Sequence, residues 1–199
     1  PPNLLPGVAP QEVHARWIYR AAIEAVDAYR KTLEHVAYDR RTQQLTVDGR
    51  VYDLSQVKRV ILVGMGKAAD RIAQALSDLL GDRITVGQVN ASADEMIGSI
   101  TVTAAGHPTP NEQSIAGAKR MLELVEQAGP EDLVIAAITG GGSALAAIPA
   151  EGLELEDLIA VNKLMQRHKL DITKLNTVRP TLDQIKAGNL RRRAANAKA

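Results

Sequence analysis

The residues in this sequence with the clearest chemical potential are glycines that follow apolar runs. Gly64-Met65-Gly66-Lys67 comes directly after the run VILV, and it fits G-x-G-x-x-A, a pattern in which a tight turn opens a helix. The free amide groups and partial positive charge of such a helix start favour a phosphate. Lys67 adds an ammonium group, which suits phosphoryl charge. The pattern indicates an anion site; the alternative is a solvated lysine in a first helical turn.

A second glycine loop follows another apolar run. TGGGSAL comes after DLVIAAI, and three adjacent glycines cost backbone entropy. The loop does not match the Walker pattern G-x-x-x-x-G-K-[ST]. Successive amide groups can nevertheless form an anion-binding concavity, to which Ser143 adds a hydroxyl. The alternative is close strand–helix packing with Ser143 as a cap. Three glycines exceed what packing needs, so we expect Gly140, Gly141, Gly142 and Ser143 to bind a ligand.

Two further loops carry polar side chains. In GHPTPNE the prolines fix the backbone, and His107, Asn111 and Glu112 could face a ligand, although a histidine in a turn is more often structural. In NTVR, Arg179 could clamp an oxyanion or a carboxylate, because its guanidinium presents a planar fork of donors. The alternative is an ordinary loop leading to a helix.

The apolar pattern predicts alternating strands and helices that would position these loops. Strands are predicted at 59–63, 84–90, 99–106 and 132–139, and helices at 68–80, 114–128, 155–167 and 181–196. This alternation indicates an α/β fold with a Rossmann-like, mostly parallel sheet and helices on both faces. The loops after the strands would then meet at one edge of the sheet, where ligands bind.

The first part of the chain has a different pattern. Apolar residues recur at three- and four-residue spacing from Gln11 to about Val36, which predicts one long amphipathic helix. QLTVDGRVYDL then alternates around Asp48-Gly49, the signature of a two-residue hairpin. With 199 residues, the chain is expected to form a single α/β domain over residues 1–199.

The composition excludes several classes of function. The chain has 24 Lys and Arg against 23 Asp and Glu, so its charge gives no reason to expect a nucleic acid or an anionic membrane as partner. It has no cysteine, which excludes disulfides and thiolate chemistry and fits a cytoplasmic location. We expect a small-molecule substrate and no membrane.

Taken together and in order, these motifs resemble those of the glycerate 2-kinase family, which includes hydroxypyruvate reductase-like proteins. The resemblance runs from about Val60 to Leu190 and is carried by GMGKAA, AGHPTPNE, TGGGSAL, LNTVR and IKAGNL. It implies ATP-dependent phosphorylation of D-glycerate to 2-phosphoglycerate with Mg²⁺. It also implies that Lys67 is catalytic and that His107 and Arg179 bind the substrate. The nucleotide phosphates would contact Gly64, Gly66, Gly140, Gly141, Gly142 and Ser143.

The sequence departs from this family in several places. Ala104 stands where the family often has a glutamate, and Pro180-Thr181-Leu182-Asp183 replaces the usual K-H-L-S after NTVR. Members of the family also carry a second α/β domain. We therefore expect this chain to be the N-terminal domain of a two-domain kinase without its C-terminal domain. Such a chain would be weakly active or inactive, and an exposed cleft wall would favour a homodimer.

Two other functions remain open from the sequence. The chain could be a non-catalytic module that binds a nucleotide or a phosphosugar. A dehydrogenase is the third hypothesis; it would require an acidic residue at the end of the second strand, to hold a ribose. That strand is predicted to end at Asn90, and Asp94 comes late.

Overall fold

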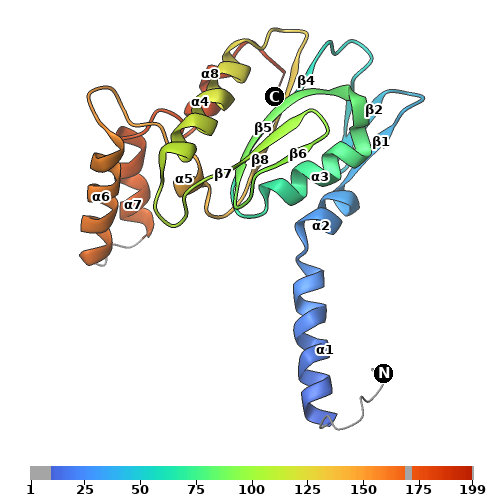
Figure 1. The fold of residues 1–199 in the computed structure, drawn as a ribbon. Coiled ribbons are helices and arrows are strands. Elements are labelled where there is room, and N and C mark those ends of the chain that lie inside the picture. The colour runs from blue at the N-terminus through green and yellow to red at the C-terminus, as the bar shows by residue number, and fades with distance from the viewer. Residues whose placement is uncertain (1–9, 169–171, 199) are drawn as a thin grey trace.

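The centre of the molecule is a mostly parallel sheet. The computed structural model describes residues 10–168 and 172–198, and within them five strands pair in the order β6-β7-β5-β4-β8 (Figure 1). Only β6 runs antiparallel to its neighbour. If the parallel strands β4, β5, β7 and β8 are numbered 1 to 4 as they occur along the chain, they lie side by side in the sheet in the order 3-2-1-4. This is the beginning of the standard Rossmann order. The strands are β4 (Val60–Met65), β5 (Ile84–Ala91), β6 (Glu95–Ile97), β7 (Ile100–Ala104) and β8 (Leu133–Ile138).

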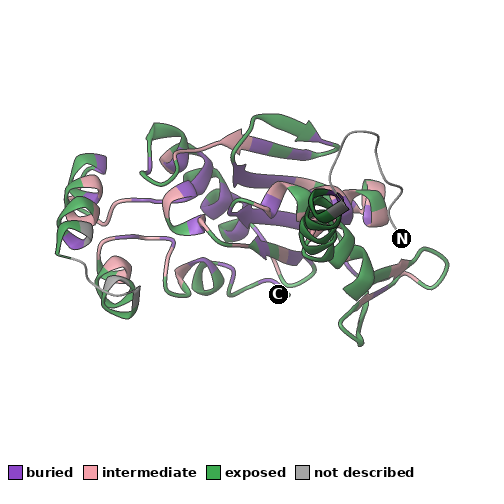
Figure 2. Ribbon diagram, turned by 90° about the horizontal axis from the view of Figure 1, so that it is seen from below, coloured by how far each residue is buried: buried purple, intermediate pink, exposed green. Residues whose placement is uncertain are grey.

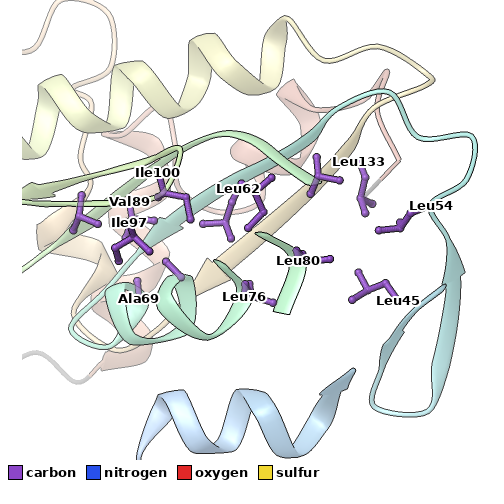
Figure 3. Packing of buried hydrophobic residues seen from close by; sticks show 14 of the residues in the cluster. Leu45, Leu54, Leu62, Ala69, Leu76, Leu80, Val89, Ile97, Ile100 and Leu133 are labelled. Carbon is purple, nitrogen blue, oxygen red and sulfur yellow. The ribbon is translucent and has the colours of Figure 1, made fainter. Parts of the chain in front are cut away.

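Helices cover both faces of this sheet, as predicted. Alternate residues of β4 enter two cores: Leu62 belongs to the core under α3 (Ala69–Leu80), whereas Ile61 belongs to the core under α4 (Glu112–Glu126) and α8 (Asn189–Arg193). Burial on both faces explains why β4 is a continuous apolar run. Figure 3 shows the first core, where Leu76 and Leu80 of α3 lie beneath the sheet.

A smaller sheet precedes the main one. Its strands are β1 (Val36–Asp39), β2 (Gln44–Val47) and β3 (Arg50–Asp53), paired antiparallel in that order. The hairpin predicted between β2 and β3 is confirmed, with positive φ angles of 47° at Asp48 and 79° at Gly49. Leu45 of β2 and Leu54, which directly follows β3, pack into the core beside α3 (Figure 3).

The single long helix predicted from Gln11 to Val36 is wrong. The structure has α1 (Pro10–Ala25) and α2 (Ala28–His35) instead. Asp27 separates them, because its side chain accepts the Arg30 amide at 2.9 Å and caps α2. The β-branched Val36 pairs with Val47 in β1. Helix α1 projects away from the sheet and is exposed along most of its length (Figures 1 and 2).

The last third of the described chain also differs from the prediction. Residues predicted as a helix over 181–196 form a turn and the short α8, because positive φ angles of 52° at Ala187 and 82° at Gly188 interrupt them. The NTVR segment (176–179) is predicted as a loop. In the structure its first three residues end helix α7, and Arg179 begins the short helix η2. The remaining elements are η1 (Gly81–Arg83), α5 (Gly142–Leu145), α6 (Leu155–Arg167), α7 (Ile172–Val178) and η2 (Arg179–Thr181). Within the described residues, every helix is too short or too polar to cross a membrane.

Candidate functional site

The two glycine-rich loops are joined directly by backbone hydrogen bonds. The Lys67 amide donates to the Gly140 carbonyl at 2.9 Å, and the Thr139 amide donates to the Met65 carbonyl at 2.9 Å. The Thr139 hydroxyl accepts the Ala68 amide at 3.2 Å. Strands β4 and β8 are the first and fourth strands of the parallel sheet, so the loops meet at its topological switch point. Ligands of open α/β sheets bind at this point.

Gly141 lies between two other predicted site residues, Lys67 and His107. Its φ is +90°, and a Cβ built on it would lie 3.0 Å from Lys67 Cγ and 3.3 Å from His107 Nε2. The stem of Lys67 and the imidazole ring of His107 therefore flank the glycine loop. Both side chains are exposed, so their polar ends are accessible to a ligand.

Three other predicted glycines are closely packed within the fold itself, and the tightest of them is Gly66. A Cβ on Gly66, whose φ is +134°, would lie 2.0 Å from Thr139 Oγ1. Gly64 lies inside β4, where a Cβ would be 3.0 Å from the Ala137 carbonyl oxygen, and a Cβ on Gly142 would be 3.0 Å from Met65 Cγ. Close packing accounts for these three glycines, and their contact with a phosphate stays a prediction.

Packing does not explain Gly140, and helix capping does not explain Ser143. A Cβ on Gly140 would meet no atom within 4 Å, and Gly140 is not among the glycines with positive φ. Neither space nor backbone conformation therefore requires a glycine there. The alternative that Ser143 caps a helix is wrong, because Gly141 holds the N-cap position of α5 and the cap has no side-chain hydrogen bond. The Gly140 backbone and the Ser143 side chain are both exposed beside Gly141.

A cavity of about 690 Å³ opens beside this loop. Its polar and basic lining includes the glycine loop, Ser143, Arg179, Lys186 and Arg191. No carboxylate is among the described residues that line it. The Arg179 guanidinium donates to Asn162 Oδ1 at a distance of 3.4 Å. The cavity therefore has a basic lining that suits an anion.

Lys186 is a residue that sequence reasoning missed. Its side chain is only 14% exposed and forms an ion pair with Asp183, which is 1% exposed. Burial lowers the pKa of the Lys186 ammonium, Asp183 opposes that shift, and Arg179 lowers the pKa further. Lys186 stands in the IKAGNL motif, but nothing in that motif alone distinguishes a buried lysine from a solvated one.

Asn90 is a second residue missed in this way. It is fully buried, and its side-chain amide donates to the Leu145 carbonyl at 2.8 Å and to the Ser114 carbonyl at 3.3 Å. The backbone carbonyl of Asn90 accepts the Gly66 amide at 3.1 Å. Asn90 therefore connects both glycine loops to α4. The signal in the sequence was a polar residue at the end of an apolar strand.

Two other residues considered as ligand contacts have structural roles. Asn111 caps α4 in a capping box, in which its side chain accepts the Ser114 amide at 3.0 Å. Asp94, the nearest acidic residue after β5, accepts the Ala104 amide at 2.7 Å. Its carboxylate therefore holds the end of β7, whereas a dehydrogenase would need an acidic residue to hold a ribose.

The site offers little to a divalent cation. Within the part of the chain that the structure describes, no three histidine or acidic residues come together to hold a metal ion. Mg²⁺ prefers carboxylate and phosphate oxygens, and the cavity lining supplies no carboxylate. The described residues do not fit a bound Mg²⁺.

Strand order and site together define the class of the protein. It is an α/β domain of Rossmann-like order with a positively charged loop site at the switch point of its sheet. Over residues 14–199 the chain matches the family described as "Domain of unknown function (DUF4147)", and it belongs to that family.

Relatives with named functions confirm the resemblance seen in the motifs. The chain is 36% identical over 169 residues to a protein of Pyrococcus horikoshii named "Glycerate 2-kinase", a match that covers 85% of this chain and 38% of that protein. It is 35% identical over 177 residues to the "D-glycerate 2-kinase" of Thermotoga maritima, covering 87% of this chain and 41% of that protein. The chain thus spans about two fifths of the length of these relatives.

Solved structures agree with the assignment of the chain to this family. A crystal structure of a protein from P. horikoshii OT3 superimposes with a TM-score of 0.80 at 32% identity, covering 97% of this chain and 43% of that one. The crystal structure of glycerate kinase from T. maritima superimposes with a TM-score of 0.72 at 34% identity, covering 92% of this chain and 41% of that one.

Proposed function

We propose that this chain is the N-terminal, phosphate-binding domain of an ATP-dependent glycerate 2-kinase, which converts D-glycerate to 2-phosphoglycerate. The observation that carries the proposal is the position of Lys67 beside the triple-glycine loop and His107 at the switch point of the sheet. The names of the relatives support glycerate as the substrate. The absence of cysteine fits action in the cytoplasm, where ATP is supplied.

In this proposal Lys67 stabilises the negative charge of the transferred phosphoryl group. Its ammonium is exposed, while its stem packs over Gly141 and its backbone is fixed by Gly140. A preorganised cation at the reacting centre lowers the barrier because it need not reorganise during the reaction. The bare backbone of Gly140 lets phosphate oxygens approach closely, and the Ser143 hydroxyl adds a donor.

The acid substrate would lie between His107 and the basic residues of the cavity. Arg179 is one of these basic residues, and a guanidinium pairs well with a carboxylate because it offers two parallel donors. His107 flanks Gly141, which also lines the cavity. In this arrangement the carboxylate of glycerate faces Arg179 and its hydroxyl faces Lys67.

The described residues make up only part of a kinase site. They provide cations and amide donors but no carboxylate to serve as a base or as a metal ligand. We therefore assign no step to Mg²⁺ on these residues. We expect weak or no turnover from this chain alone, because a phosphoryl-transfer site must exclude water and close on its substrates.

A non-catalytic role is the second candidate. The same absence of a carboxylate favours a module that binds a nucleotide or a phosphosugar without transferring phosphate. The two functions share Lys67 and the glycine loop, and they differ in whether phosphate reaches glycerate.

Calorimetry and a coupled assay would test both candidates. We expect the chain to bind ATP and 2-phosphoglycerate, and Lys67→Ala to weaken ATP binding about tenfold, the effect of losing one charge-assisted contact. Lys119→Ala is the matched control, because Lys119 is exposed on α4, away from the glycine loops. ATP binding unchanged by Lys67→Ala would refute the site. Binding without turnover of D-glycerate supports the module, and rapid turnover by the chain alone would show that the site is complete.

A further inference from the structure

One buried hydroxyl closes the loop that carries His107, residues 106–111, which we call the histidine loop. Ser114 lies in the first turn of α4 and is fully buried. Its hydroxyl oxygen accepts the Gly106 amide at 3.1 Å and the Asn111 amide at 3.1 Å, and it donates to Asn111 Oδ1 at 3.1 Å. A hydroxyl has one donor and two acceptor sites, so all three are used here. Both ends of the histidine loop therefore rest on one side chain.

His107 depends on this loop for its position. Its side chain is exposed, and within residues 10–168 and 172–198 no hydrogen bond reaches its imidazole. The ring nevertheless lies against the glycine loop, because a Cβ built on Gly141 would be 3.2 Å from His107 Cδ2 and 3.3 Å from Nε2. Since the ring has no polar anchor of its own, the backbone of the histidine loop sets its distance from Gly141.

Ser114 also reaches the glycine loop, through its backbone carbonyl. This carbonyl accepts the Ala147 amide at 3.4 Å and Asn90 Nδ2 at 3.3 Å. Asn90 Nδ2 donates as well to the carbonyl of Leu145 at 2.8 Å. Leu145 ends α5, the helix whose N-cap is Gly141. One residue therefore joins the histidine loop to the segment that follows the glycine loop.

We propose that Ser114 is a positioning residue of the candidate site, and that its hydroxyl holds the His107 imidazole at the glycine loop. The capping box of α4 explains why this hydroxyl accepts the Asn111 amide. It does not explain the hydrogen bond from Gly106, which lies outside the helix. The proposal deepens the proposed function and rests on it only for the effect on substrate binding.

The loss of this hydroxyl should affect one side of the site and spare the other. Substitution of Ser114 removes the hydroxyl and leaves the carbonyl, so the histidine loop should move while the glycine loop stays in place. The backbone of Lys67 is held separately, by the 2.9 Å hydrogen bond from its amide to Gly140. Small displacements of positioning groups weaken binding and catalysis strongly. We therefore expect weaker binding of the acid and unchanged binding of ATP.

Nuclear magnetic resonance on the whole chain would test the position of His107. The observable is the nuclear Overhauser effect between the His107 ring and the α-protons of Gly141, and His107→Gln would identify this ring among the four histidines. Ser114→Ala should abolish the effect. Ser114→Thr and Ser114→Val add the same bulk and differ only in the hydroxyl, so the first should retain the effect and the second should lose it. This pair decides the question if Ser114→Ala does not fold.

Calorimetry on the same variants would test the consequence for binding. We expect Ser114→Ala and Ser114→Val to bind 2-phosphoglycerate about fivefold more weakly, the equivalent of one neutral hydrogen bond, and to bind ATP as the unsubstituted chain does. Asp27→Ala is the matched control. Asp27 caps α2 through one hydrogen bond of 2.9 Å, and α2 contributes none of the described residues of the cavity beside the glycine loop. This variant should melt at a lower temperature and keep the Overhauser effect and both affinities.

Three results would overturn the proposal: an unsubstituted chain without the Overhauser effect, an effect that persists in Ser114→Ala and Ser114→Val, or one that is lost equally in Ser114→Thr and Ser114→Val. The last result would assign the role to the shape of the side chain and not to its hydroxyl. If the Overhauser effects change as expected but the unsubstituted chain binds neither ATP nor 2-phosphoglycerate, the positioning role of Ser114 is supported and the proposed function fails.

Discussion

The backbone amide of Lys67 donates a 2.9 Å hydrogen bond to the carbonyl oxygen of Gly140. This bond ties the loop after the first parallel strand to the loop after the fourth. The backbone that carries the cation of the candidate site and its glycine loop therefore form one hydrogen-bonded unit. Because side chains on such a unit are positioned by backbone contacts, small backbone changes should affect ligand binding strongly.

Adjacent glycines in this loop should respond differently to substitution. Gly141→Ala places a Cβ at a φ of +90° and within 3.0 Å of Lys67 Cγ, so we expect a loss of about 1–3 kcal/mol in unfolding free energy. Gly140→Ala meets no atom within 4 Å and should change stability by less than about 0.5 kcal/mol. It should nevertheless weaken ATP binding. Urea unfolding and calorimetry separate the two effects, and unchanged affinity in Gly140→Ala would remove its backbone from the site.

The sequence predicted the central sheet well because each strand carries its own signal. VILV and LVIAAI are apolar without alternation since both faces of the sheet are covered, and the glycines after them mark the turns. From this, the shared edge of Lys67 and Gly141 could be expected before the structure was known. The glycines themselves were harder to interpret. Gly66 looks like a ligand contact in sequence, but its positive φ and its contact with Thr139 already account for a glycine there.

Features that depend on tertiary neighbours could not be predicted. The break at Asp27 rests on one side-chain cap that interrupts an otherwise helical pattern. Lys186 becomes notable only because folding buries it beside Asp183, and Asn90 because its amide meets two carbonyls from distant segments. In each case the sequence gives the residue type without its partner.

Asn90 should be coupled to Gly117. Asn90→Ala removes donors from two buried carbonyls and leaves a cavity, so we expect a loss of about 2–4 kcal/mol in unfolding free energy. Gly117→Ala should also destabilise the protein, because its Cβ would lie 1.9 Å from Asn90 Oδ1. In the double variant the clash disappears. Its loss should therefore be smaller than the sum of the single losses, and additive losses measured by urea unfolding would contradict this contact.

Asp132 should make stability depend on pH. Its carboxylate accepts from Arg59 at 2.6 and 3.1 Å, and these hydrogen bonds, helped by the Gly129 amide, hold the pKa of Asp132 below its ordinary value of 3.8. A lowered pKa in the folded state adds stability above the ordinary value, and this stability is lost as pH falls through the folded value.

We expect Asp132→Asn to cost about 1.5–3 kcal/mol at pH 7, the range for hydrogen bonds to a charged group. The difference from the unsubstituted chain should shrink below pH 4. Glu131→Gln is the control, because Glu131 pairs with Lys58 on the surface and exposed pairs contribute little. A difference between Asp132→Asn and the unsubstituted chain that stays constant from pH 7 to pH 3 would contradict the assignment.

Lys186 should contribute separately to stability and to anion binding. Lys186→Met leaves Asp183 buried without its cation, and we expect a loss of about 3–5 kcal/mol in unfolding free energy, as for other broken buried pairs. The double variant Lys186→Met/Asp183→Asn removes both charges and should recover most of that stability. It should not recover affinity for 2-phosphoglycerate, since the cavity still lacks one of its cations. Urea unfolding and calorimetry on the two variants distinguish the roles. If affinity returns together with stability, Lys186 serves only to satisfy Asp183, and Arg179 and Arg191 carry the charge of the cavity.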